Sequence, residues 1–197
     1  MLKKITSFVE TSELPTDIAD FKVHAFTEEQ SKKDHLVISF GNLESEKPIL
    51  ARIHSQCITG ESFFSMRCDC RFQLTESLKQ IANNGSGAIF YLQQEGRGIG
   101  LSNKIRAYKL QDDGMDTVEA NHQLGFHGDE RNYEIVASMA DHLNINAVNL
   151  MTNNPKKINA LEKLGLKVNN RIPILSESNK HNKKYLKTKE QKLGHLF

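Results

Sequence analysis

The sequence predicts an α+β protein, in which a mixed β-sheet has a β-rich first third and then alternating strands and helices. The first third contains short segments with alternating or β-branched apolar residues. After the cysteines the apolar spacing becomes helical, from Phe72 to Ile81, and this pattern ends at Asn83-Asn84-Gly85. The predicted early strands cover residues 21–26, 35–40 and 49–54.

The later elements follow from the same two periodicities. A turn at Gly41-Asn42 separates two early strands, and Pro48 precedes the third. Residues 87–92 and 147–151 have the apolar character of buried strands, and Leu166 opens a final strand segment. Helices are predicted around residues 105–110, 133–143 and 154–164, the last with Pro155 in its first turn.

Length and composition narrow the class of protein. The 197 residues suit one domain, and the formal net charge of +2 indicates neither a nucleic-acid nor a membrane partner. No apolar run approaches the ~20 residues of a membrane helix, and the N-terminus lacks the apolar stretch of a signal peptide. We therefore expect a cytoplasmic protein.

All three cysteines, Cys57, Cys68 and Cys70, lie close together in the sequence. An odd, clustered set is not typical of a disulfide framework and favours metal binding or catalysis. Three thiolates without an obvious fourth ligand fit a catalytic zinc site, whereas buried structural cysteines are the alternative. The flanking Arg67 and Arg71 favour the thiolate form that a metal requires.

Two loops could bind an anion, because each follows a predicted strand and precedes a helix. Residues 95–100 are glycine-rich, with an ordinary tight turn as the alternative. Residues 152–157 combine a hydroxyl with two lysines, and this motif alone favours a capped helix with both lysines exposed over a phosphate site.

Other polar residues have ordinary interpretations beside functional ones. Asp129 could be a helix N-cap, Arg131 a surface charge and Tyr108 part of the core. From about residue 179 the chain is rich in lysine, with six lysines between 180 and 192. A solvated helix face is the expected role of this segment, and RNA binding is the alternative.

Six strings along the chain are distinctive when they are taken together and in order. They are Ala51–Cys57, Arg67–Cys70, Gln94–Leu101, Asn103–Tyr108, Asp116–His122 and Leu150–Lys157. In this order they resemble the GTP cyclohydrolase II family, so that a single domain of this family is expected over residues 1–197. Such a protein would be a zinc-dependent hydrolase of cyclic amidines that opens the imidazole ring of GTP. It would release formate and pyrophosphate in the first step of riboflavin biosynthesis.

The resemblance also implies the site residues, a homodimer, and magnesium bound with the triphosphate. Cys57, Cys68 and Cys70 match the zinc ligands, and Tyr108, Asp129 and Arg131 match the catalytic positions. The matching GTP-binding positions are Arg52, Ile53, His54, Ser55, Gln56, Gln73, Glu95, Gly96, Arg97, Thr117, Thr152 and Lys157.

Two positions depart from the family pattern. Gln56 stands where the family commonly has Glu, which changes the hydrogen bonds offered to a substrate. Arg71 stands where a Gly is usual. A family member with lost or altered activity therefore remains an alternative. Two other functions are alternatives, an RNA-binding structural zinc module and a zinc-dependent base deaminase. The His-x-Glu and Pro-Cys-x-x-Cys patterns of such deaminases are absent from this sequence.

Overall fold

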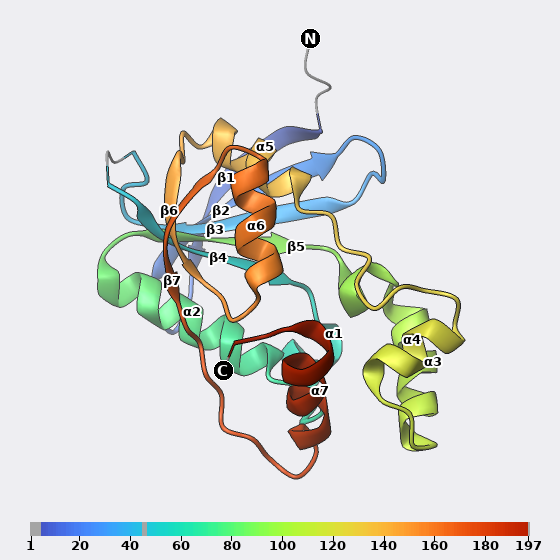
Figure 1. Ribbon diagram of the computed structural model, residues 1–197. Coiled ribbons are helices and arrows are strands. Elements are labelled where there is room, and N and C mark those ends of the chain that lie inside the picture. The colour runs from blue at the N-terminus through green and yellow to red at the C-terminus, as the bar shows by residue number, and fades with distance from the viewer. Residues whose placement is uncertain (1–4, 45–46, 197) are drawn as a thin grey trace. The chain divides into compact units, whose positions relative to one another are not determined.

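The computed structural model describes residues 5–44 and 47–196 and confirms the α+β class (Figure 1). Its strands form a seven-stranded sheet in the order β1-β2-β3-β5-β4-β6-β7. The strands are β1 (Thr6–Pro15), β2 (Asp20–Glu28), β3 (Asp34–Phe40), β4 (Ile49–Ser55), β5 (Gly87–Leu92), β6 (Ala147–Met151) and β7 (Lys167–Ile172).

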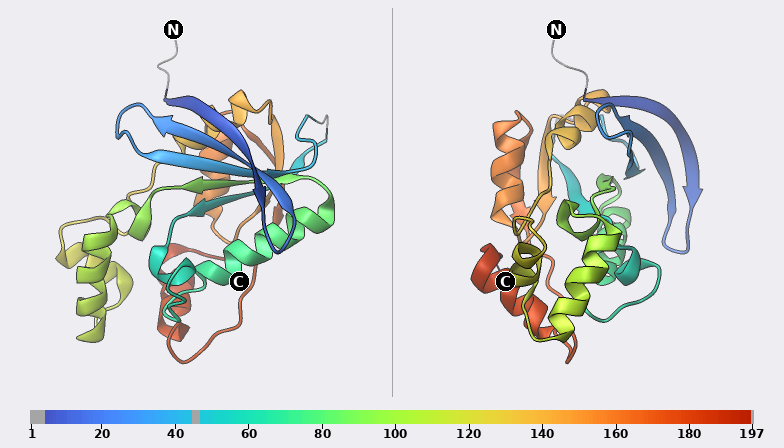
Figure 2. Two further views of the ribbon diagram at one scale, coloured as in Figure 1. Left: turned by 180° about the vertical axis from the view of Figure 1, so that it is seen from behind. Right: turned by 90° about the vertical axis from the view of Figure 1, so that its right-hand side faces the viewer.

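The sheet is mixed, as expected. The pairs β1–β2, β2–β3 and β3–β5 are antiparallel, while β4–β6 and β6–β7 are parallel. Strand β1 was not predicted, because most of its residues are exposed or half-buried and its sequence has no clear apolar alternation. It pairs with β2 along its whole length, and the two form the curved hairpin on the right of the right-hand view in Figure 2.

The helices confirm the predicted pattern and add three short elements. Gly85 follows α2 with φ of +81°, the left-handed conformation that commonly ends a helix. The missed elements are α4 and two elements that are too short to give a periodic signal, α1 and η1. The helices are α1 (Ile58–Glu61), α2 (Cys70–Asn84), η1 (Glu95–Gly98), α3 (Leu101–Asp112), α4 (Thr117–Gln123), α5 (Glu134–His142), α6 (Pro155–Lys163) and α7 (Lys183–Leu193).

The main hydrophobic core lies between the sheet and helices α5 and α6. Strands contribute Val37, Phe90 and Leu150, while Met139 of α5 and Leu161 of α6 pack against them. These side chains are essentially inaccessible to water. Their burial provides the principal hydrophobic stabilisation of the sheet.

The chain divides into two compact units. The sheet unit contains the described residues up to 54, with 75–93 and 133–174. The thiol unit contains residues 55–74, 94–132 and the described part of 175–197. The expectation of a single catalytic domain stays a prediction. Across residues 5–44 and 47–196, no helix has the length and apolar character to cross a membrane.

Candidate active site

The three cysteines converge in the thiol unit. Cys57 precedes α1, Cys68 lies in the following loop, and Cys70 begins α2. Their sulfur atoms lie within 4.8 Å of one another, and the sulfurs of Cys57 and Cys68 are 3.7 Å apart. Tetrahedral zinc with Zn–S bonds of about 2.3 Å would hold two sulfurs about 3.8 Å apart. The thiols therefore fit zinc.

The backbone beside the thiols leaves no space for a side chain at position 60. A Cβ atom built on Gly60 of α1 would lie 2.8 Å from the sulfur of Cys68 and 3.1 Å from that of Cys57. Within the described residues, this cluster contains the three cysteines and no fourth Cys, His, Asp or Glu. Three protein ligands are the usual number at a catalytic zinc site, which keeps one position open.

Lys104 of α3 adds a buried positive charge to this group. Its Nζ atom donates to the sulfur of Cys57 at 3.1 Å and to Oε1 of Glu95 at 2.7 Å. Hydrogen bonds, chiefly from Cys68, and the charge of Lys104 hold the pKa of Cys57 well below its usual range. Burial alone would lower the pKa of Lys104, but the charge of the Cys57 thiolate beside it raises that pKa. The site thus favours one thiolate even without metal.

Tyr108, also on α3, lies beside the thiols. Its hydroxyl is 3.3 Å from Oγ1 of Thr59, which is 3.8 Å from the sulfur of Cys57. Burial raises the pKa of Tyr108, so the phenol stays protonated at neutral pH. Lys104 and Arg67 both lie over its ring, at 5.5 and 5.0 Å from the centroid. The hydroxyl is therefore a proton donor near the thiol group.

The glycine-rich loop is strained and packed. Gly96, Arg97 and Gly98 all have positive φ values, of 63°, 60° and 96°. A left-handed arginine costs roughly 1–2 kcal/mol, and such strain clusters at functional sites. Glu95 fixes the start of the loop, accepting from the backbone N–H of Ile58 at 2.7 Å and of Gly96 at 3.0 Å.

Arg97, in the same loop, is half-buried. Both terminal guanidinium nitrogens are buried, and neither has a hydrogen-bond partner among the described residues. Buried charges in proteins are normally paired. The loop contacts the segment of Asp129 and Arg131, because the Arg97 carbonyl accepts from the N–H of Glu130 at 3.0 Å. The charge of Arg97 also helps to lower the pKa of nearby Asp129.

Asp129 and Arg131 form a bidentate ion pair. The interpretations of Asp129 as a helix N-cap and of Arg131 as a surface charge therefore do not hold. Asp129 accepts from Nε of Arg131 at 2.7 Å and from Nη2 at 2.6 Å. It does not cap α5, whose N-cap is Tyr133, and the Arg131 side chain is only 10% exposed. Burial would raise the pKa of Asp129, but its hydrogen bonds with Arg131 and the nearby charge lower it.

The sheet unit holds five of the expected GTP-binding residues, including Ile53 and the buried Thr152. Arg52 donates to Nδ1 of His54 and to the Met151 carbonyl, each at 3.2 Å. Lys157 is also buried and donates to the Ile53 carbonyl at 2.8 Å. The expectation that both lysines of this loop are exposed is therefore wrong for Lys157. Asn154 caps α6 as that interpretation required.

The remaining expected residues lie in the thiol unit. Ser55 is 3.5 Å from Nη1 of Arg131, Gln73 donates to Asp69 at 2.7 Å, and Thr117 is the first residue of α4. Gln56 is half-buried. Whether these side chains bind substrate stays a prediction.

The lysine-rich segment is not simply a solvated face. Lys189 of α7 is 6% exposed and donates to Oδ1 of Asp69 at 2.6 Å. Sequence reasoning also missed Lys104 and Thr59. The only available signal was position: Lys104 lies inside the string Asn103–Tyr108, and Asp69 lies between two candidate ligands.

Known sequences are similar to this chain over nearly its whole length. The sequence profile described as GTP cyclohydrolase II matches residues 7–173. A GTP cyclohydrolase-2 from Saccharophagus degradans is 56% identical, over 96% of this chain and 95% of that protein. One from Azotobacter vinelandii is 53% identical, over 96% and 91%.

A solved structure supports the fold. It is a two-domain 3,4-dihydroxy-2-butanone 4-phosphate synthase from A. baumannii, with a TM-score of 0.54 and 16% identity. The similarity covers 87% of this chain and 41% of that one. At this identity it supports the architecture alone. The sequence matches, together with the clustered thiols, establish that the chain belongs to the GTP cyclohydrolase II family.

Proposed function

We propose that the chain is an active GTP cyclohydrolase II. It hydrolyses GTP, releases formate and pyrophosphate, and leaves 2,5-diamino-6-ribosylamino-4(3H)-pyrimidinone 5′-phosphate, the first step of riboflavin biosynthesis. Membership of the family supports this activity. The observation that carries the proposal is the short series of contacts from Cys57 through Thr59 to the hydroxyl of Tyr108.

Ring opening needs an activated water and a proton donor. Cys57, Cys68 and Cys70 would hold one zinc ion, which supplies Lewis-acid activation of water near neutral pH. Tyr108 then donates a proton to the leaving ring nitrogen, because its raised pKa keeps the phenol protonated. Lys104 stabilises the thiolate of Cys57 that metal binding requires.

Pyrophosphate release uses the arginines of the thiol unit. The buried guanidinium of Arg97 binds phosphate oxygens, which would provide its missing hydrogen-bond acceptors. Arg131 stabilises the charge of the phosphoryl transition state. A nucleophilic Arg131 would need Asp129 as a base, but the lowered pKa of Asp129 makes it a poor proton acceptor. Trapping a phosphoramide on residue 131 would contradict this electrostatic role.

We infer that the other expected positions also bind GTP and that magnesium accompanies the triphosphate. Exposed apolar side chains of the thiol unit, Phe63, Phe64 and Met66, support a homodimer. Metal-binding thiols suit a reducing compartment, which supports the cytoplasm. The GTP-binding residues proposed here are Arg52, Ile53, His54, Ser55, Gln56, Gln73, Glu95, Gly96, Arg97, Thr117, Thr152 and Lys157.

One assay tests the proposal. The purified protein is incubated with GTP, zinc and magnesium, and formate and pyrophosphate are measured together. We expect both products in equal amounts. Neither product would reject the proposal, and one product alone would indicate a changed activity. Formation of xanthosine triphosphate with release of ammonia would instead identify a deaminase.

A further inference from the structure

We propose that α7 is a positioning helix for the thiol site, in which Lys189 fixes the segment that carries Cys68 and Cys70, and Tyr185 orients Arg97. This inference rests on the proposed function, since it assigns α7 a part in zinc and phosphate binding. The helix lies in the thiol unit and beyond the residues that match the family profile, which end at 173.

The first contact joins α7 to the segment that carries Cys68 and Cys70. Lys189 donates to one carboxylate oxygen of Asp69 at 2.6 Å, and Gln73 donates to the other at 2.7 Å. Asp69 is 3% exposed and lies between Cys68 and Cys70 in the sequence. A carboxylate held from both sides restrains the backbone that carries two of the three thiols.

The second contact joins α7 to Arg97 in the glycine-rich loop. The guanidinium carbon of Arg97 lies 5.5 Å from the centre of the Tyr185 ring, and the ammonium of Lys189 lies 4.6 Å from it. Cations are attracted to aromatic faces within about 6 Å. The ring therefore restrains the guanidinium without using its hydrogen bonds, which stay available for an anion.

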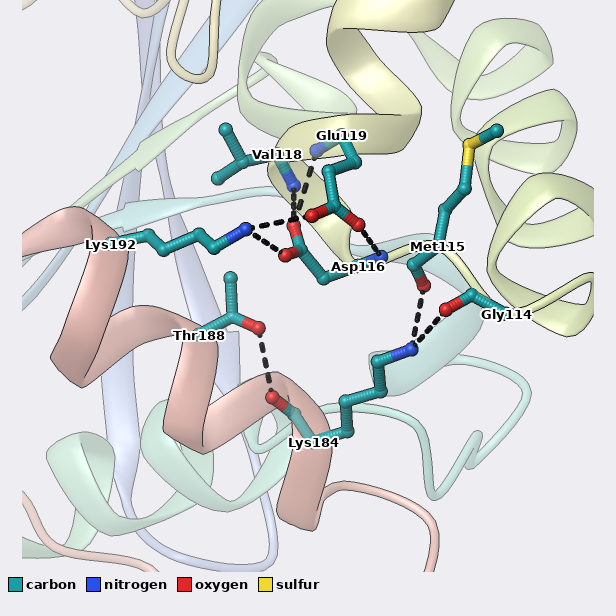
Figure 3. A network of polar contacts seen from close by, with 8 residues as sticks. All are labelled: Gly114, Met115, Asp116, Val118, Glu119, Lys184, Thr188 and Lys192. Atoms are coloured by element: carbon teal, nitrogen blue, oxygen red, sulfur yellow. Dashed lines mark hydrogen bonds and ion pairs between the residues drawn. The ribbon is translucent and has the colours of Figure 1, made fainter.

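Two further lysines anchor the helix at both ends (Figure 3). Lys184 donates to the backbone carbonyls of Gly114 and Met115 at 2.5 and 3.0 Å. Lys192 forms ion pairs with Asp116 and Glu119. Asp116 and Glu119 also form the capping box of α4. With both ends fixed, α7 can hold Lys189 and Tyr185 in place.

Position matters here because metal–ligand distances tolerate only about 0.2 Å of error. Residues that orient metal ligands typically change metal affinity or activity by about 10–100-fold when they are replaced. Removing the Lys189 ammonium leaves the Asp69 carboxylate buried with one partner fewer, which favours movement of the loop. We expect an effect of that size on zinc affinity.

The test compares Lys189→Met with Lys187→Met, a matched change at an exposed position on the same helix. Zinc affinity is measured by competition with a chromophoric chelator, and kcat and KM are measured with GTP. We expect Lys189→Met to bind zinc about 10–100-fold more weakly than Lys187→Met, with folding verified by circular dichroism. Equal zinc affinity in the two variants would overturn the inference.

A double variant distinguishes an effect of the Lys189–Asp69 ion pair from a general loss of stability. Asp69→Asn combined with Lys189→Met removes both charges, so its zinc affinity should fall less than the product of the two single effects. Fully independent effects would contradict a role through this pair. For the second contact, Tyr185→Leu should raise KM for GTP and should weaken zinc binding less than Lys189→Met does. An unaltered KM would refute the orienting role of Tyr185.

These outcomes are distinct from failure of the proposed function. If the wild-type protein and Lys187→Met release neither formate nor pyrophosphate, the proposed function fails. If both are active and Lys189→Met matches them in zinc affinity and kinetics, only the role of α7 fails.

Discussion

Replacing Gly60 by Ala should weaken zinc binding by crowding the thiols. The added methyl would lie 2.8 Å from the sulfur of Cys68 and 3.1 Å from that of Cys57, whereas ordinary contact begins at 3.4 Å. To restore ordinary contact, the added methyl and the two sulfurs must separate by a further 0.6 Å and 0.3 Å, the differences between 3.4 Å and these two distances. Both shifts exceed the tolerance of about 0.2 Å for zinc ligands.

The expected loss of zinc affinity is at least tenfold, which corresponds to about 1.4 kcal/mol. Overpacking alone typically costs about 1–3 kcal/mol of folding stability, so melting temperature is followed in parallel. Gly128→Ala is the matched control, because the nearest atom to its added methyl lies at 3.7 Å, in ordinary contact.

Chelator competition on zinc-loaded protein measures the effect. We expect the Gly128 variant to remain within twofold of wild type and the Gly60 variant to fall at least tenfold. A Gly60→Ala protein that holds zinc as tightly as wild type would refute the inference that these three sulfurs form the metal site.

Three other predictions address the neighbouring residues. Tyr108→Phe should lower the rate of formate release by about 10²–10⁴-fold with zinc content unchanged, because it removes a proton donor; full activity would exclude that role. Asp129→Asn should destabilise the protein at pH 7, as measured by urea unfolding. The lowered pKa of Asp129 means that its ion pair stabilises the fold above about pH 3.8, and this contribution is lost as the pH falls further. The gap to wild type should therefore narrow below that pH, and a constant gap would contradict the argument. Asp116→Ala should cost about 1–2 kcal/mol in the same assay through loss of the α4 cap, and no change would exclude the capping contribution.

The regular elements were predictable because their burial gives a clear period. Strand β5 is almost entirely buried, β6 has no exposed residue, and α2 ends just before the glycine that the sequence indicated. Strand β1 was missed because it lies at the edge of the sheet and its polar residues carry no period. Tertiary pairing with β2, rather than local preference, determines that strand.

The site was predictable in its residue types more than in its contacts. The spacing of Cys57, Cys68 and Cys70 indicated a metal site, and the structure brings their sulfurs together. No local pattern shows that Lys189 is buried against Asp69, since the two residues are 120 positions apart. Lys157 was likewise expected to be exposed, because burial of a lysine depends on a distant carbonyl acceptor. Long-range ion pairs of this kind leave no periodic signal in a single sequence.

The central claim is that the three thiols hold the metal that opens the guanine ring. Cys68→Ser tests it most directly, with zinc content and formate release from GTP measured in the same preparation as wild type. We predict that the variant loses bound zinc and that formate release falls to background while the protein remains folded. Unchanged formate release by a zinc-free Cys68→Ser protein would contradict the account.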